Sequence, residues 1–241
     1  MRFVGSKGGS GIAQWIISAM PYHRLFVEGF AGTGKITKTK LPAARTLWIE
    51  RDRQTISDYL RRYTETHRDV AIKAGDAFKI LPTLKLDRTG LVYLDPPYLQ
   101  ESRSWQRRSY YRHELLTVED HKRLLDLART LPCNVMISGY WSELYASVLD
   151  GWRSDFKWTV TRRGKAVKEW LWMNFPPPAL LHDTRFVGTD FTDRQRIKRK
   201  VARWSKKFLA MPAHERGAIW DALNSAVRRP EQTKMTVCPA T

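Results

Sequence analysis

The chain has 241 residues, a hydrophobic content of 42% and a formal net charge of +18 at pH 7. This length and apolar content predict one sizeable core with an appendage, and they exclude an intrinsically disordered protein. The charge is extreme for an enzyme of small metabolites and favours a polyanionic partner, with nucleic acid ahead of an anionic membrane surface. Ten Trp, nine Tyr and nine Phe residues strengthen that preference, because nucleic-acid bases stack on aromatic rings.

Cysteine usage and hydropathy predict a soluble cytoplasmic protein. Cys133 and Cys238 are too few to form a metal site, and we expect both to be reduced thiols. No stretch approaches eighteen consecutive apolar residues, and residues 1–7 lack the apolar segment of a signal peptide. We therefore expect no metal, no membrane association and a reducing compartment.

Two glycine-rich stretches lie near the N-terminus. Residues 5–11 include Lys7 and Gly8, and they are typical either of a loop that approaches a ligand or of a disordered N-terminus. A helix is predicted over residues 12–19. A buried strand from Leu25 then leads into the turn 28–35, whose glycine spacing resembles dinucleotide-binding turns but lacks the Gly-Lys-Ser/Thr of a phosphate-binding loop.

The next two predicted strands each end near an acidic residue. Residues 46–50 form the first, at the distance from the glycine turn where nucleotide-binding α/β folds hold two ribose hydroxyls. Glu50 and Asp52 both fit that role, and the position at the strand end favours Glu50. An amphipathic helix is predicted over residues 54–66. Residues 70–74 form the second strand, followed by Asp76 and a short helix.

Residues 90–98 combine a buried strand with a rigid acidic end. Residues 90–94 are apolar without alternation, and Pro96 and Pro97 have no N–H for a sheet, so the strand must end at Asp95. A loop that happens to contain two prolines is the alternative. Because apolar strands alternate with helices and deliver a glycine turn or an acid at the same end, we predict an α/β, Rossmann-like parallel sheet with its site at that edge.

Residues 99–113 interleave arginine and aromatic residues without an apolar period. This composition suits contacts with nucleic-acid phosphates and bases, although a solvated surface loop has the same composition. The residues that we expect to bind nucleic acid here are Arg103, Trp105, Arg107, Arg108, Tyr110, Tyr111 and Arg112. A capping-box-like pattern at Thr117 then begins a helix.

The remaining chain predicts a strand, a hairpin and a helical extension. Residues 134–139 form a buried strand, and residues 156–161 and 168–174 form an antiparallel hairpin. The hairpin's basic tip consists of Arg162, Arg163 and Lys165. We expect one domain at 1–180 and a basic extension at 181–241, with helices near 193–210 and 213–227 and a disordered tail.

The first helix of the extension is strongly basic. Lys198, Arg199 and Lys200 lie beside an apolar stripe, and we expect them to contact phosphates. An ordinary amphipathic surface helix, packed by its stripe, is the alternative interpretation.

Three motifs together resemble a known family. The segments Gly5-Ser6-Lys7-Gly8, Glu28-Gly29-Phe30-Ala31-Gly32-Thr33-Gly34 and Asp95-Pro96-Pro97-Tyr98 occur in the order of the Dam-type (alpha-group) N6-adenine DNA methyltransferases. The similarity extends over about residues 2–178. It implies S-adenosyl-L-methionine as methyl donor, DNA as partner, methylation of a flipped adenine at N6, and a bacterial or phage-encoded protein in the host cytoplasm.

The same resemblance implies a role for each motif residue. The Asp95 carboxylate and the Pro96 carbonyl would accept hydrogen bonds from the target amine, while Tyr98 stacks on the flipped base. Glu50 would hold the cofactor ribose and Asp76 the cofactor adenine amine. The catalytic set is thus Asp95, Pro96, Pro97 and Tyr98, and the cofactor-binding set is Lys7, Gly8, Glu28, Phe30, Gly32, Gly34, Glu50, Asp76 and Asp95.

The chain departs from the family pattern at two points. Gly29 stands where the family usually has proline. Between Gly34 and Asp95 there is room only for the strands and helices of the sheet, so the usual inserted target-recognition domain is missing. We therefore predict short or relaxed sequence specificity. An adenine methyltransferase of RNA and an inactive nucleic-acid-binding module are the alternatives, and N4-cytosine methylation fits less well because those enzymes more often carry serine at the position of Asp95.

Overall fold

The computed structural model describes residues 11–99, 117–161 and 164–228. The chain divides into two compact units, Met1–Phe186 and Val187–Thr241. The boundary expected from the sequence, at 180/181, lies just before this division. Residues 181–186 belong to the first unit because their 3-10 helix η3 (Thr184–Phe186) packs against helix α1 (Ile12–Ser18).

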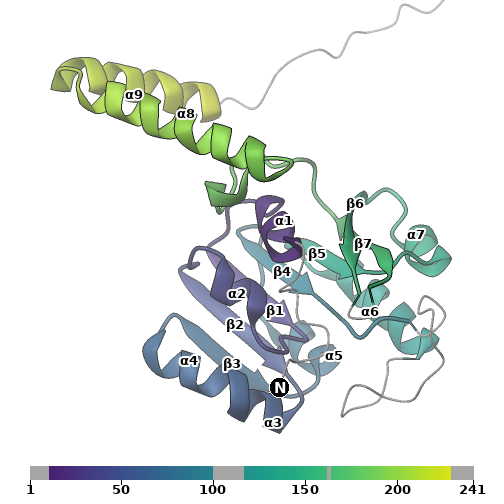
Figure 1. Ribbon diagram of the computed structural model, residues 1–241. Coiled ribbons are helices and arrows are strands. Elements are labelled where there is room, and N and C mark those ends of the chain that lie inside the picture. Colours follow the sequence, from purple (N-terminus) through teal and green to yellow (C-terminus); the bar gives the residue numbers. More distant parts are fainter. Residues whose placement is uncertain (1–10, 100–116, 162–163, 229–241) are drawn as a thin grey trace, which may run out of the picture. The chain divides into compact units, whose positions relative to one another are not determined.

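The first unit is built on a seven-stranded sheet with the order β3-β2-β1-β4-β5-β7-β6 (Figure 1). Its strands are β1 (Leu25–Gly29), β2 (Arg45–Glu50), β3 (Val70–Ala74), β4 (Gly90–Leu94), β5 (Asn134–Gly139), β6 (Arg153–Val160) and β7 (Ala166–Met173). Strands β1 to β5 are parallel, whereas β7 is antiparallel to β5 and β6 to β7. The predicted α/β methyltransferase-type sheet, with its C-terminal hairpin, is therefore confirmed.

Helices cover both faces of this sheet. The first face is covered by α1, α2 (Lys35–Thr39), α3 (Arg53–Thr55), the π-helical turn η1 (Ile56–Leu60) and α4 (Arg61–Thr66). The second face is covered by α5 (Ala77–Ile80), the 3-10 turn η2 (Leu81–Thr83), α6 (Val118–Thr130) and α7 (Glu143–Val148). Strand β4 lies between these layers and is buried at all of its positions, which explains its unbroken apolar sequence.

Local sequence signals account for most of the helix boundaries. The expected helix over 54–66 is present as the consecutive segments α3, η1 and α4, with a π turn in place of regular helix. Helix α6 begins with the predicted capping box, in which Thr117 and Asp120 exchange side-chain and backbone hydrogen bonds. In the part of the chain that the structure describes, no helix is long and apolar enough to cross a membrane.

The second unit contains helices α8 (Phe191–Leu209) and α9 (Ala213–Arg228), close to the two predicted ranges. Asp190 caps the N-terminus of helix α8, and its side chain accepts a hydrogen bond from the Asp193 N–H at 2.8 Å. In the apolar stripe of α8, Val201 and Trp204 retain 59% and 57% of their accessible areas, whereas Ile197 and Phe208 are half-buried.

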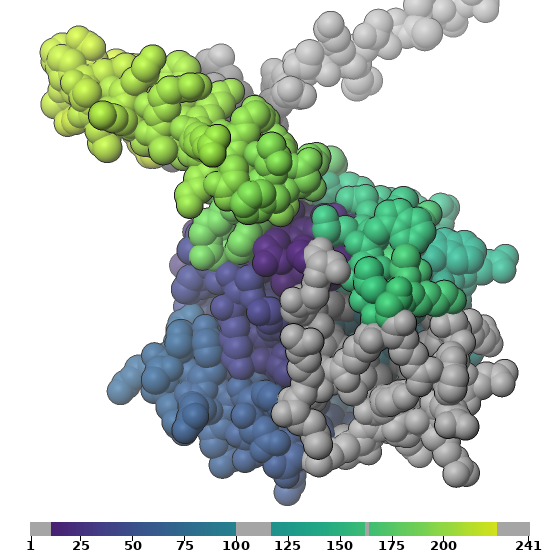
Figure 2. All heavy atoms as spheres, in the orientation of Figure 1, coloured from purple at the N-terminus to yellow at the C-terminus, as the bar shows by residue number. Residues whose placement is uncertain are grey.

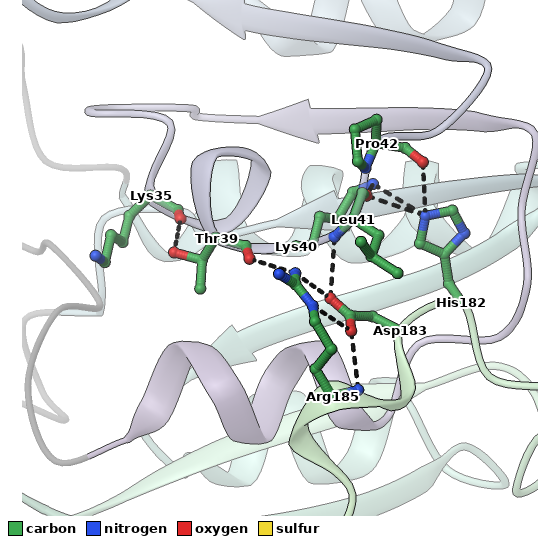
Figure 3. Close-up of polar contacts among 8 residues, drawn as sticks. All are labelled: Lys35, Thr39, Lys40, Leu41, Pro42, His182, Asp183 and Arg185. Carbon is green, nitrogen blue, oxygen red and sulfur yellow. Dashed lines mark hydrogen bonds and ion pairs between the residues drawn. The ribbon is translucent and has the colours of Figure 1, made fainter. Parts of the chain in front are cut away.

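A buried polar cluster fastens the segment after β7 to the end of α2 (Figure 3). The Asp183 carboxylate is fully buried and accepts hydrogen bonds from the Leu41 N–H at 2.9 Å, the Arg185 N–H at 3.0 Å, and the Arg185 guanidinium at 2.7 and 2.9 Å. Arg185 also donates to the Thr39 carbonyl at 2.8 Å. Charge-assisted hydrogen bonds thereby join Asp183 and Arg185 to residues more than 140 positions earlier in the sequence.

The same cluster holds two stacked histidines beside a lysine. The rings of His23 and His182 lie 3.8 Å apart, and the Lys40 ammonium approaches His182 Nε2 at 3.5 Å. Burial lowers the pKa of His23 to about 2, helped by the positive charge of Lys40, so His23 is neutral at physiological pH. Burial likewise lowers the pKa of Lys40 to about 8.

Candidate active site

The acidic end of β4 is held by its neighbour β5. The Ser138 hydroxyl donates a hydrogen bond to Asp95 Oδ1 at 3.0 Å, and the Tyr93 hydroxyl lies 2.7 Å from the same Ser138 oxygen. Because serine has a single hydroxyl proton, its donation to Asp95 leaves Tyr93 as the donor to Ser138. A relay of two hydroxyl groups therefore fixes the orientation of the Asp95 carboxylate.

Tyr98 is fastened to the hairpin strand β7. Its hydroxyl donates to Glu169 Oε1 at 2.7 Å, and its ring packs against Tyr140 with centroids 4.4 Å apart. Burial raises the pKa of Tyr98 well above its ordinary value, and the carboxylates of Glu169 and Asp95 raise it further. Tyr98 is therefore a neutral hydrogen-bond donor whose ring position is set by its polar end.

The glycine turn after β1 has left-handed backbone at three of its residues. Phe30, Gly32 and Gly34 have φ values of 57°, 54° and 64°. A Cβ atom at Gly34 would collide with the Trp48 indole, so this glycine permits close packing against β2. At Gly29 a Cβ would lie 2.7 Å from Leu94 Cδ2. The glycine at position 29, where the family usually has proline, thus fits the close approach of β4.

Glu50 joins the ends of β1 and β2. Its Oε2 accepts a hydrogen bond from the Gly32 N–H at 2.8 Å, and its Oε1 accepts from the N–H groups of Arg51 and Asp52 at 2.8 and 2.9 Å. Asp52 instead caps α3, accepting from the Gln54 N–H at 2.9 Å. The structure therefore brings Glu50, and not the alternative Asp52, against the glycine turn.

Asp76 lies at the end of the next strand, β3. Its Oδ1 accepts a hydrogen bond from the Phe78 N–H at 3.0 Å and so caps helix α5. The Gly75 N–H donates to the Glu50 carbonyl at 2.9 Å, which connects this turn to the end of β2. The turn, Glu50, Asp76 and Asp95 thus follow four adjacent parallel strands at the same edge of the sheet, as the sequence predicts.

Glu28 has an internal role that the sequence did not indicate. Its carboxylate is 3% exposed, and its Oε2 accepts hydrogen bonds from the Thr37 hydroxyl at 2.5 Å and the Trp48 indole N–H at 2.9 Å. Burial raises the pKa of Glu28, although the hydrogen bonds from Thr37 and Trp48 oppose this shift. These contacts hold α2 against β2, and a direct contact between Glu28 and the cofactor stays a prediction.

The residues at this edge fit S-adenosyl-L-methionine. A left-handed glycine turn lets a ligand come close to the backbone, and carboxylates at the ends of β2 and β3 suit ribose hydroxyl and adenine amine donors. Glu50 is additionally preorganised by three backbone N–H groups, so its carboxylate would not need to reorient on binding.

Several expected site residues cannot be placed in this way. Lys7 and Gly8, the hairpin-tip residues Arg162 and Arg163, and the set Arg103, Trp105, Arg107, Arg108, Tyr110, Tyr111 and Arg112 lie outside the described residues. Lys165 is exposed in the hairpin, and Lys198, Arg199 and Lys200 are exposed on α8 of the second unit. The described part of the site also contains Ser138, Tyr140 and Glu169, which sequence reasoning had not assigned to it.

The nearest sequence signal for these missed residues is weak. Ser138 and Tyr140 flank the glycine at the end of β5, and it is the pairing of β5 with β4 that brings them to the site edge. Glu169 interrupts the apolar positions of β7 that face the core. A buried carboxylate needs a partner, but nothing in the sequence identifies Tyr98 as that partner.

Residues 50–163 match the model of the D12 class N6 adenine-specific DNA methyltransferases. The match includes Glu50, Asp76 and Asp95–Tyr98 but begins after the glycine turn. No curated protein matches the chain.

Parts of this chain are similar to solved structures of methyltransferases. The 23S rRNA methyltransferase ErmE has 14% sequence identity and a TM-score of 0.46, over 77% of this chain and 81% of its own. Precorrin-6y C5,15-methyltransferase from Geobacter metallireducens has 12% identity and a TM-score of 0.45, over 71% and 93%. The SAM-dependent methyltransferase from Agrobacterium tumefaciens has 13% identity and a TM-score of 0.45, over 68% and 60%. At these values the similarities do not bear on the substrate.

The family match confirms the resemblance that the motifs had indicated, and with it the expected cofactor. The chain is an S-adenosyl-L-methionine-dependent methyltransferase, and its residues 50–163 are similar to the D12 class N6 adenine-specific DNA methyltransferases.

Proposed function

We propose that the protein methylates the exocyclic N6 amine of adenine in DNA. The observation that carries this proposal is the Asp95-Pro96-Pro97-Tyr98 segment, fixed at the end of β4 by Ser138 and Glu169. This segment lies at the same edge of the sheet as the glycine turn and Glu50. A target amine and a methyl donor that bind at these two places would meet at one edge of the sheet.

The chemistry requires positioning more than activation. An adenine amine is a poor nucleophile because its lone pair is delocalised into the ring. The Asp95 carboxylate and the Pro96 carbonyl would accept its two N–H groups out of the ring plane, which favours a pyramidal nitrogen with an available lone pair. S-adenosyl-L-methionine, when bound, supplies a methyl group that is already electrophilic. The chain's residues then need only to hold the two reactants in line.

An adenine inside a duplex must be extruded to reach such a pocket, which costs a few kcal/mol of stacking and pairing. Tyr98 would recover part of that cost by stacking on the base. Its hydrogen bond to Glu169 supports this role, because a ring held by its hydroxyl loses little conformational entropy when a base arrives.

Sequence recognition is expected to be short or relaxed. Between Gly34 and Asp95 the chain forms only the strands and helices of the sheet, and no inserted domain is present in this described stretch. The surfaces left to contact DNA are the segment 99–113, the hairpin tip and the basic residues of α8. Their excess of positive charge favours contacts to phosphates, which carry no direct sequence information.

The proposal is tested by offering three polymers with labelled S-adenosyl-L-methionine. We expect methyl transfer to unmethylated duplex DNA and to single-stranded DNA, spread over many short sequence contexts. Transfer to ribosomal RNA fragments alone would show that the substrate is RNA. A strict recognition site of six or more base pairs would contradict the relaxed specificity. An absence of cofactor binding in calorimetry would favour an inactive nucleic-acid-binding module.

A further inference from the structure

The hairpin β6–β7 carries an exposed strip of aromatic and aliphatic side chains. Phe156, Trp158 and Val160 occupy alternate positions of the edge strand β6 and retain 38%, 59% and 57% of their accessible areas. Their cross-strand partners on β7 are Trp170, Lys168 and Ala166. Alternate residues of a strand share one face, so these six residues form a continuous strip, which we call the aromatic strip. Figure 2 shows the hairpin, in teal-green, at the molecular surface.

The aromatic strip is preorganised and basic. Phe156 and Trp170 pack with centroids 5.1 Å apart, and the Lys168 ammonium lies 4.1 Å from the Phe156 ring and 5.3 Å from the Trp158 ring. These cation–π contacts hold the ammonium beside the rings in a fixed place. The two acidic residues of the described hairpin, Asp155 and Glu169, alternate with the strip residues and so point to the opposite face. Among its six residues the strip therefore presents aromatic rings together with one cation, Lys168, and no acidic side chain.

The strip and the contact with the candidate active site lie on opposite faces of the same hairpin. Strand β7 pairs with β5 only from Trp170 to Met173, so the part of the hairpin between Lys157 and Lys168 extends beyond the end of β5. Glu169, which holds the Tyr98 hydroxyl, lies between Lys168 and Trp170 on β7, so its side chain points to the face opposite to the strip. A polymer strand that delivers a base to Tyr98 would have its adjacent nucleotides within reach of this hairpin.

We propose that the aromatic strip stacks unpaired bases next to the target nucleotide, with Lys168 at the neighbouring phosphate. The inference rests on the proposed function and adds a substrate class, namely nucleic acid with unpaired nucleotides around the target. Aromatic platforms with interleaved cations bind single strands in this way, and they tolerate any sequence because every base has a stacking face. That tolerance agrees with the relaxed specificity expected for this chain.

The test compares Trp158→Ala with Trp220→Ala, because both tryptophans are 59% exposed. Binding of a labelled single-stranded oligonucleotide and of a perfect duplex is measured by fluorescence anisotropy at several salt concentrations. We expect Trp158→Ala to raise the Kd for the single strand about 5- to 150-fold, with an unchanged salt slope. Trp158→Phe should restore most of the affinity, and Trp220→Ala should change the Kd less than about twofold. Circular dichroism confirms that each variant is folded.

A second variant separates stacking from charge. Lys168→Gln should reduce the slope of log Kd against log salt by about 0.7 for the single strand, the loss of one phosphate contact. In turnover, Trp158→Ala should raise the KM for the polymer and leave the affinity for S-adenosyl-L-methionine unchanged.

Two results would overturn the inference. These are an unchanged single-strand Kd in Trp158→Ala and an equal loss of affinity in Trp220→Ala. If an unchanged Kd in Trp158→Ala came with an altered oligomeric state, it would show that a second copy of the chain covers the strip. Strip-dependent binding without any methyl transfer would instead refute only the proposed function, so the two failures are distinguishable.

Discussion

Asp95→Asn is expected to lower the rate of methyl transfer by about 10²- to 10³-fold or more, the usual loss when a preorganised charged group of a reaction centre is removed. Asparagine keeps the shape of the side chain, and its amide oxygen can still accept the Ser138 hydrogen bond. What it loses is the negative charge that favours a pyramidal amine. The effect should therefore appear in kcat measured with saturating cofactor and DNA.

Two comparisons make this result specific to Asp95. Asp126→Asn changes a solvent-exposed carboxylate of α6 and should leave kcat unchanged. Calorimetry should show that Asp95→Asn weakens S-adenosyl-L-methionine binding no more than about tenfold, the value of one hydrogen bond. Activity of Asp95→Asn near the wild-type level would refute the proposed mechanism. A complete loss of cofactor binding would show instead that Asp95 acts mainly by binding the cofactor.

The largest effect on stability is expected from the polar cluster of Figure 3. Asp183→Asn should lower the free energy of unfolding by about 2–4 kcal/mol, because an amide NH₂ group would face the N–H donors of Leu41 or Arg185 in a buried place. Urea unfolding followed by circular dichroism measures this difference. The exposed change Asp126→Asn should cost less than about 0.5 kcal/mol.

The pH dependence of this difference follows from the pKa of Asp183. Burial raises that pKa, but the hydrogen bonds from Arg185 and Leu41 outweigh burial and leave the pKa below its ordinary value of 3.8. A carboxyl group whose folded-state pKa is lowered stabilises the protein above its unfolded-state pKa, and this contribution is lost as the pH falls through the folded-state value. The difference between wild type and Asp183→Asn should be constant near neutral pH and shrink below about pH 4. A difference that persists unchanged in acid would show that packing, and not charge, is responsible.

The sequence was informative about this fold because its strands are buried on both faces. An unbroken apolar run such as β4 has few other interpretations, and prolines after Asp95 end it unambiguously. The acids and glycines that follow successive strands then meet at one edge for topological reasons alone. Glycine spacing, helix capping at Thr117 and the two terminal helices were predictable for the same reason, since each is determined by neighbouring residues.

What could not be predicted depends on side chains distant in the sequence. Ser138 reaches Asp95 from another strand, and Glu169 reaches Tyr98 across 71 positions. Glu28 turns inward because Trp48 and Thr37 offer donors there, a choice that the local sequence does not reveal. The Asp183 cluster likewise joins α2 to a segment more than 140 positions later. Such contacts depend on the packed structure and leave no periodic signal.

The most direct test of the central claim is the identity of the methylated nucleoside. Unmethylated genomic DNA is incubated with labelled S-adenosyl-L-methionine and the wild-type protein, or with Asp95→Asn, and then digested to nucleosides for chromatography. We expect N6-methyladenine to be the labelled product of the wild type. The wild type should yield at least about 10²-fold more of this product than Asp95→Asn. N4-methylcytosine as the labelled product, or equal N6-methyladenine from the two proteins, would contradict this expectation.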